Sequence, residues 1–210
     1  MDLNLWLTFV AASFILLVIP GPTILLVLSY ALSQGRKVAL ATVAGVALGD
    51  FIAMSASLMG LGALVLASAT LFVALKWIGA AYLIYLGIKL YRSAADARLG
   101  DISSDTALPV TGVFSHAATV TALNPKSIVF FIAFVPQFIR PENSLLPQFA
   151  VLIVTFVGLA SLNALVYALL ADRMRAKIER PSVIVGLSRF GGGVLIAMGV
   201  ATAMFKRTSA

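Results

Sequence analysis

Two charged residues lie deep inside long apolar stretches of this sequence. Asp50 lies near the centre of the stretch 38–67, and Lys126 lies inside the stretch 111–139. An ionisable group inside a membrane span is costly and is therefore read first as functional. Each group must be paired, protonated or in contact with water. Asp50 could exchange a proton with its surroundings, or it could pair with Lys126. The alternative for Asp50 is an ion pair with Lys126 that has only a structural role. The alternative for Lys126 is a side chain that extends to the membrane interface.

The motif Pro20-Gly21-Pro22 predicts a broken helix. Because proline lacks an N–H and clashes with the preceding turn, the carbonyls of Leu16 and Val18 are expected to lose their helical partners. Glycine lets the backbone leave helical angles, and a second helix would begin near Thr23 with free N–H groups. Free carbonyl and N–H groups suit the ammonium and the carboxylate of an amino acid. The alternative is a kink whose groups are satisfied by neighbouring helices.

A second break is expected at Asn124-Pro125-Lys126, at nearly the same offset in its own apolar stretch. Pro125 is expected to free the carbonyl of Thr121. The side chain of Asn124 can both donate and accept hydrogen bonds. The two breaks together predict a polar site within the apolar part of the chain.

Four further residues are weaker candidates for this site. His116 could relay protons near neutral pH, although a lone histidine is more often a satisfied polar contact. Asn163 could line a cavity or bond between helices. Gly45 and Gly49 belong to a stripe of small residues four apart, which favours close packing of another helix beside Asp50.

The composition excludes most other kinds of chemistry. The chain has 210 residues, of which 61% are hydrophobic and 11% charged, with no cysteine and one histidine. Disulfides, thiolate metal sites and cysteine nucleophiles are excluded, and no metal-ligand spacing, cofactor motif or catalytic constellation is present. We therefore expect neither an enzyme nor a cofactor-binding protein. The net charge is +7, and most of the basic residues that produce it lie between the apolar runs. This placement indicates that they orient the chain in a membrane rather than bind nucleic acid.

The elements that position these residues are predicted to be membrane-spanning helices. A span needs roughly 20 apolar residues. We expect an all-α polytopic bundle, a single membrane domain over 1–210, with about six spans; the apolar segments are 4–33, 38–67, 70–91, 111–139, 146–171 and 184–205.

Basic residues predict how the bundle is oriented. Ten of them lie between spans one and two, three and four, or five and six, against four on the opposite side. The excess of Lys and Arg marks the cytoplasmic loops, so both termini are expected outside. Lys206 and Arg207 argue mildly against this orientation.

The two halves of the sequence look like repeats. Residues 76–87 and 188–199 align without gaps, and the two proline breaks also correspond. Repeat one would cover about 4–91 and repeat two about 111–205, joined by a loop over about 92–110. Because each repeat would hold three spans, the second would be inverted, which is a signature of secondary transporters. Chance similarity between apolar helices is the alternative.

These motifs resemble the LysE/RhtB family of bacterial amino-acid exporters. The resemblance covers nearly the whole chain, and it rests on Pro20-Gly21-Pro22, Gly45, Gly49-Asp50, 77–87, Asn124-Pro125-Lys126 and 189–199. It implies a multi-pass efflux carrier of the bacterial inner membrane that exports amino acids and is driven by the proton gradient, with no cofactor. Many family members carry an acidic residue where this chain has Thr23, so a neutral substrate such as threonine or homoserine is favoured over a basic one.

Other functions remain open at this point. The chain could carry another small solute such as a metal ion, although a hard cation favours several carboxylates and only Asp50 is buried. It could also be a membrane scaffold that transports nothing. The sequence allows a homo-oligomer but does not determine one.

Overall fold

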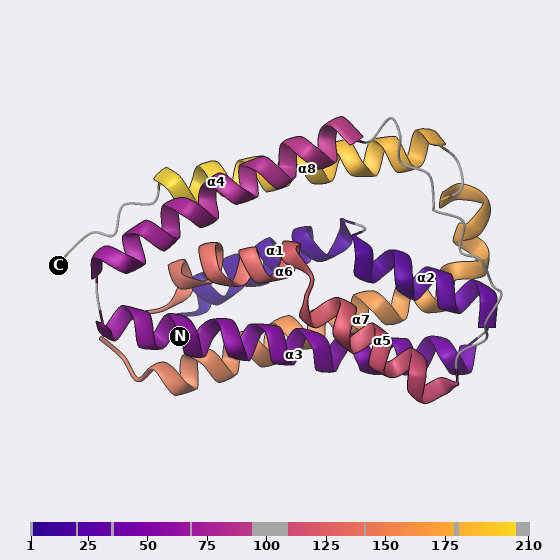
Figure 1. Cartoon of the computed structure of the whole chain (residues 1–210), viewed down its shortest axis with the longest axis horizontal. Helices are drawn as coiled ribbons and strands as arrows, with labels where there is room; N and C mark the ends of the chain where they lie inside the picture. Colours follow the sequence, from indigo (N-terminus) through magenta and orange to yellow (C-terminus); the bar gives the residue numbers. More distant parts are fainter. Residues whose placement is uncertain are drawn as a thin grey trace.

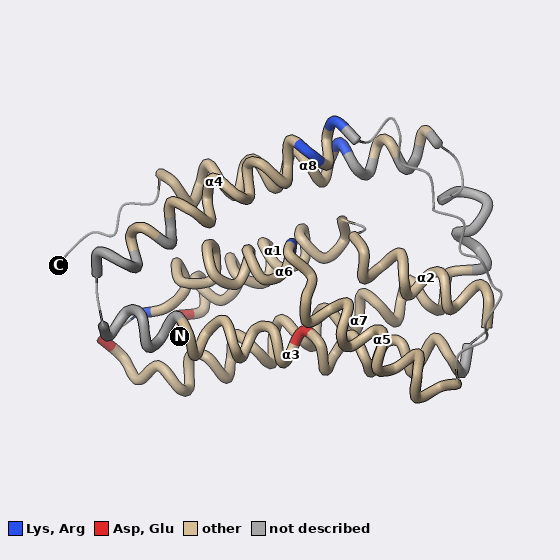
Figure 2. Tube along the Cα trace, in the orientation of Figure 1, with Lys and Arg blue, Asp and Glu red and all other residues tan. Residues whose placement is uncertain are grey.

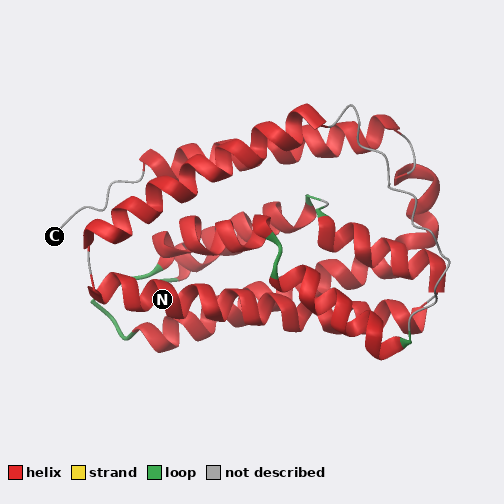
Figure 3. Cartoon of the chain, viewed as in Figure 1, coloured by secondary structure: helices red, strands yellow, loops and turns green. Residues whose placement is uncertain are grey.

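The computed structural model describes residues 2–19, 21–34, 36–67, 69–93, 109–140, 142–178 and 181–204. These residues form helices joined by short connections, with no strand among them (Figure 3). The predicted connecting loop falls largely on residues 94–108, and with Pro20 it lies outside the described part of the chain.

The first apolar stretch forms two helices instead of one. Helix α1 covers Leu3–Val18 and α2 covers Pro22–Gln34, and their axes are bent by 55° at the break. A proline at the first position of a helix is well tolerated, because the N–H that it lacks would have no helical partner there. The predicted break is confirmed, with the second helix beginning one residue before Thr23.

The next two stretches form long uninterrupted helices. Helix α3 covers Arg36–Ala67 and carries Asp50 near its centre, and α4 covers Ala69–Ser93. Neither interior contains a proline, so nothing interrupts the backbone hydrogen bonding.

The fourth stretch is also broken, and its second part is irregular. Helix α5 covers Val110–Ala122 and α6 covers Pro125–Val129. A π-helical turn η1 (Phe130–Phe134) and a 3-10 turn η2 (Val135–Phe138) follow. The sequence predicts the break but not the π-helical turn; such turns are frequent at functional sites.

Two helices complete the bundle. Helix α7 covers Leu145–Ile178 and α8 covers Pro181–Met204. Among the described residues, Val38–Gly60, Val110–Phe138 and Leu145–Ala171 are long and apolar enough to cross a membrane, and the bent pair α1–α2 adds a fourth candidate. The predicted all-α polytopic bundle is confirmed. Helices α4 and α8 lie on the two other segments expected as spans, and in α8 the part Arg189–Met204 is apolar but shorter than a span.

Glycine contacts hold the helices in close layers. Helices α4 and α8 lie along one side of the molecule, with α1 and α6 next to them and α3 on the far side (Figure 1). A Cβ at Gly87 would come within 2.6 Å of the Gly192 carbonyl, and one at Gly192 within 2.5 Å of the Gly87 carbonyl. The absence of side chains at these positions lets α4 and α8 touch along their backbones.

The buried core is divided into two parts. One part gathers on η1, where Phe131 packs edge-to-face on Phe156 at 4.7 Å between ring centroids. The other lies among α2, α3 and α7, around Val27 and Ala164. Helix α3 contributes to both parts, since Val46 belongs to the second and Ala53, about two turns further on, to the first. Asp50 lies between them, so a polar layer separates the two apolar regions.

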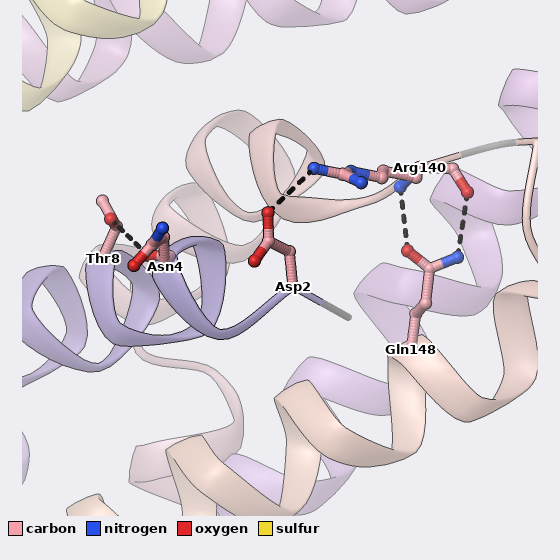
Figure 4. Close-up of polar contacts among 5 residues, drawn as sticks. All are labelled: Asp2, Asn4, Thr8, Arg140 and Gln148. Atoms are coloured by element: carbon pink, nitrogen blue, oxygen red, sulfur yellow. Dashed lines mark hydrogen bonds and ion pairs between the residues drawn. The ribbon is translucent and has the colours of Figure 1, made fainter.

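Charged residues are sparse along the helices (Figure 2). Asp2 and Arg140 form an ion pair at 3.4 Å, and both side chains are about half exposed. The Gln148 side chain accepts from the Arg140 N–H at 2.8 Å and donates to the Arg140 carbonyl at 2.9 Å (Figure 4). The start of α1 therefore lies at the same end of the bundle as the turn before α7.

Candidate functional site

A small cavity lies in the polar layer between the two apolar regions. Its volume is about 20 Å³, which leaves room for about one water molecule. Both broken helices and the long helices α3 and α7 contribute to its lining, which includes Leu16, Leu17, Gly21, Thr23, Asp50, Asn124, Lys126 and Asn163. The structure thus brings together most of the residues that the two breaks and the buried charges single out.

The buried lysine binds the end of the first helix. The Nζ atom of Lys126 donates to the carbonyl oxygens of Leu16 at 3.1 Å and of Ile19 at 2.9 Å. These carbonyls belong to the last turn of α1 and the residue after it, where the bend at the break takes the chain away from the helix axis. The charged donor satisfies acceptors that would otherwise be costly to bury.

Two side chains of α7 satisfy the carbonyls in between. Asn163 donates to the Leu17 carbonyl at 3.0 Å, and the Tyr167 hydroxyl donates to the Val18 carbonyl at 3.1 Å. The carbonyls of residues 16–19 therefore all accept from a side chain in this conformation. Tyr167 was not among the predicted site residues, although its position four residues after Asn163 places both on one face of a helix.

The second break is closed by a polar cluster. The Asn124 side chain accepts from the Lys126 N–H at 3.0 Å, which caps α6, and donates to the Thr23 hydroxyl at 3.0 Å. The Thr121 hydroxyl donates to the same Thr23 oxygen at 3.4 Å. The expectation that Pro125 frees the Thr121 carbonyl is wrong, because the Asn124 N–H donates to it at 3.1 Å in a tight turn.

Gly21 matters for space rather than for backbone conformation. Its φ angle does not lie in the left-handed region, so a special backbone geometry does not require glycine here. A Cβ at this position would lie 3.3 Å from the Lys126 Nζ and 3.5 Å from its Cε. The glycine leaves the room along which the lysine reaches the α1 carbonyls.

Asp50 is buried without a direct partner in the described part of the chain. Its side chain is 3% exposed and lines the same cavity as Lys126. No ion pair joins it to Lys126 and no described side chain donates to it, since the lysine is directed to the carbonyls of α1. An unpaired buried acid facing a cavity is a group that can take up or release a proton.

The remaining predicted residues lie outside the cavity. His116 is exposed on α5 and shares a 2.8 Å hydrogen bond between its Nδ1 and the Tyr30 hydroxyl. Gly45 and Gly49 face α5: a Cβ at Gly49 would come within 2.5 Å of the Ala118 carbonyl. The interpretation of this stripe as a packing surface is confirmed.

A second, larger cavity also borders Lys126. Its volume is about 220 Å³. Both helix breaks border it, and so do α4 and α8; its polar or break-forming lining residues are Gly21, Pro22, Lys89, Asn124, Pro125 and Lys126. In the sequence, Lys89 is only one of the basic residues that predict the orientation. Its position beside the two helix breaks is evident only from the fold.

A family model and the named relatives of this chain point to the same family of membrane translocators. The model of LysE type translocators matches residues 14–205. A protein of Vibrio cholerae named as an uncharacterized membrane protein is 32% identical over 206 residues, covering 98% of this chain and all of the relative. The homoserine/homoserine lactone efflux protein of Salmonella typhimurium is 33% identical over 199 residues, covering 95% of this chain and 96% of the relative.

A third relative matches a shorter region. The leucine efflux protein of Salmonella choleraesuis is 36% identical over 137 residues, covering 65% of this chain and 64% of the relative. No solved structure matches the chain.

Proposed function

Because the chain belongs to the LysE family of translocators, we propose that it exports neutral amino acids in exchange for protons. It is a multi-pass protein of the bacterial inner membrane and a transporter rather than an enzyme. The observation that carries the proposal is the cavity itself, where an unpaired carboxylate and a lysine face the end of a broken helix.

The balance of charges in the cavity favours a zwitterionic substrate. Asp50 and Lys126 are the charged residues in its described lining, and they offset each other. Thr23 adds a neutral hydroxyl, already bonded to Asn124, where a carboxylate would attract a second positive charge. The named relatives export homoserine and leucine, whose side chains carry no charge.

Proton coupling is assigned to Asp50. The carboxyl group lies between the two apolar regions and has no described partner, so a change in its protonation changes the charge of the cavity directly. In the deprotonated state it can attract Lys126 or the substrate's ammonium. In the protonated state it releases that cation, which links proton uptake to substrate release.

Transport requires a change of conformation. A cavity of about 20 Å³ cannot hold an amino acid, so this conformation is closed around the small cavity. We assign the opening to a rocking of two inverted repeats, 4–91 and 111–205, around the breaks at residues 20–22 and 124–125. The polar layer would remain at the pivot, with an apolar region opening on either side in turn.

Purified protein in liposomes tests this function. Vesicles loaded with unlabelled leucine, homoserine or threonine should take up the same labelled amino acid by counterflow, and an imposed pH gradient should drive net movement. Lysine- or arginine-loaded vesicles should not exchange. Exchange confined to the basic amino acids would reject the neutral preference, and an absence of exchange across all amino acids would reject the function.

A further inference from the structure

The ammonium group of Lys126 occupies a cation site made of backbone. Its Nζ lies 3.1 Å from the Leu16 carbonyl oxygen and 2.9 Å from the Ile19 carbonyl oxygen. Hydrogen bonds to a charged donor are roughly twice as strong as those between neutral groups. Nothing in this pair of oxygens is specific to lysine, so a free ammonium group of suitable size can bind there as well.

The cavity holds more acceptors for a cation than it holds cations. The α1 carbonyls form one acceptor site, and the carboxylate of Asp50, which lines the same cavity, forms another. Lys126 is the cation in the described lining, and it satisfies only the first. A second ammonium would therefore give both sites a partner.

The surroundings of Lys126 allow its side chain to move. Gly21 presents no side chain to it, so the chain from Cδ to Nζ lies against bare backbone. Lys126 also lines the larger cavity of about 220 Å³, so there is space beside this residue. The small cavity, by contrast, has no room for a substrate while the lysine lies on the carbonyls.

We infer that, when no substrate is bound, the ammonium group of Lys126 occupies the site on the Leu16 and Ile19 carbonyls that binds the substrate's amino group during transport. The ammonium of an incoming amino acid takes over the Leu16 and Ile19 carbonyls, and the displaced lysine turns toward Asp50. This inference rests on the proposed amino-acid transport and adds how the site stays satisfied between substrates. No bond is made or broken covalently; two ammonium groups exchange partners.

Replacing the lysine by alanine tests whether the carbonyls form a cation site. In detergent, Lys126→Ala should gain thermal stability on addition of n-propylammonium, which restores an ammonium and a short carbon chain at the vacated position. The wild type should gain less, because its own tethered ammonium competes for the Leu16 and Ile19 carbonyls. Met54→Ala is the matched control: it opens space at a fully buried apolar position of similar size, and it should not respond. Equal responses of Lys126→Ala and Met54→Ala would overturn the inference.

Substrate affinity tests whether the lysine competes with the amino group. If the carbonyls are vacant in about one empty wild-type molecule in ten, removing the tethered competitor lowers the apparent Kd about tenfold. Lys126→Met preserves side-chain size and should therefore fold; it should bind L-leucine or L-homoserine more tightly than wild type while transporting less. Binding equal to or weaker than wild type would overturn the inference.

The two measurements separate this inference from the proposed function. If the wild type exchanges no amino acid, the proposed function fails, yet the n-propylammonium response of Lys126→Ala still decides whether the carbonyls bind a cation. If the wild type exchanges amino acids and Lys126→Met binds them no better, the function stands and the role of the lysine is rejected.

Discussion

At the scale of single residues, the site is built from groups that have lost their usual partners. The carbonyls of residues 16–19 lie at the end of α1, and side chains of Lys126, Asn163 and Tyr167 replace the missing helical donors. A buried acceptor without a donor costs about 1–3 kcal/mol, so these side chains also stabilise the break. Asp50 is the exception, because no described group donates to it.

Asp50→Asn is expected to uncouple the transporter from protons. The amide is nearly the same size as the carboxyl group but cannot ionise, so counterflow should persist while uptake driven by a pH gradient falls to the background level. The measurement compares the two assays in the same liposomes.

Asp2→Asn is the matched control for this change. It alters the same atoms in an exposed ion pair with Arg140, where a surface pair contributes at most about 1 kcal/mol, so both assays should stay at the wild-type level. Driven transport by Asp50→Asn at the wild-type rate would reject the coupling role.

At the scale of the elements, close helix packing determines where Asp50 lies. Gly45 and Gly49 bring α3 against the backbone of α5, with a Gly49 Cβ expected 2.7 Å from the Thr121 Cβ. The residue after Gly49 is Asp50, so this contact also fixes the distance from the acid to the polar cluster around Thr23. The close packing of α3 on α5 at Gly45 and Gly49 therefore also positions Asp50 in the site.

Gly49→Ala is expected to destabilise the protein and to weaken transport. The new methyl group would lie 2.5 Å from the Ala118 carbonyl, so α3 or α5 must shift; such overpacking costs typically about 1–3 kcal/mol. Thermal unfolding in detergent should begin at a lower temperature than in wild type. Gly60→Ala, on the same helix but with nothing near its Cβ, should unfold no earlier. Equal unfolding temperatures for both variants would contradict this account.

At the scale of the whole molecule, the polar layer divides the bundle into two apolar regions. The first includes Phe131 and Phe156 and lies toward the start of α1; the second includes Val27 and Ala164. Each region can close one side of the site, which is the arrangement that alternating access needs. The Asp2–Arg140 pair places the start of α1 and the turn before α7 at one end, which agrees with the four spans predicted between them.

Single cysteines should report the orientation of the bundle. The natural chain has no cysteine, so labelling has no background. Asn143→Cys, in the turn before α7, should react with a membrane-impermeant maleimide applied to spheroplasts. Ser33→Cys, near the end of α2, should react only after the membrane is permeabilised. The opposite pattern would reverse the predicted orientation, and labelling of both from one side would reject the topology.

Much of this architecture could be predicted from local chemistry. Proline removes a helical N–H wherever it stands, so the breaks at Pro22 and Pro125 could be located without a fold. The capping of α6 by Asn124 is similarly local. The Thr121 carbonyl was mispredicted because a tight turn can satisfy a carbonyl that a helix leaves free.

The sequence by itself determined that this chain is a helical membrane protein, where its helices break and which ionisable groups are buried. These properties depend on hydropathy and on backbone chemistry, which act over a few neighbouring residues. Only the tertiary structure decided what each group touches: that Lys126 binds the α1 carbonyls instead of Asp50, and that Tyr167 and Lys89 belong to the surroundings of the site. Tyr167 and Val18 are 149 positions apart along the chain. Only the packing of the helices brings such distant partners together.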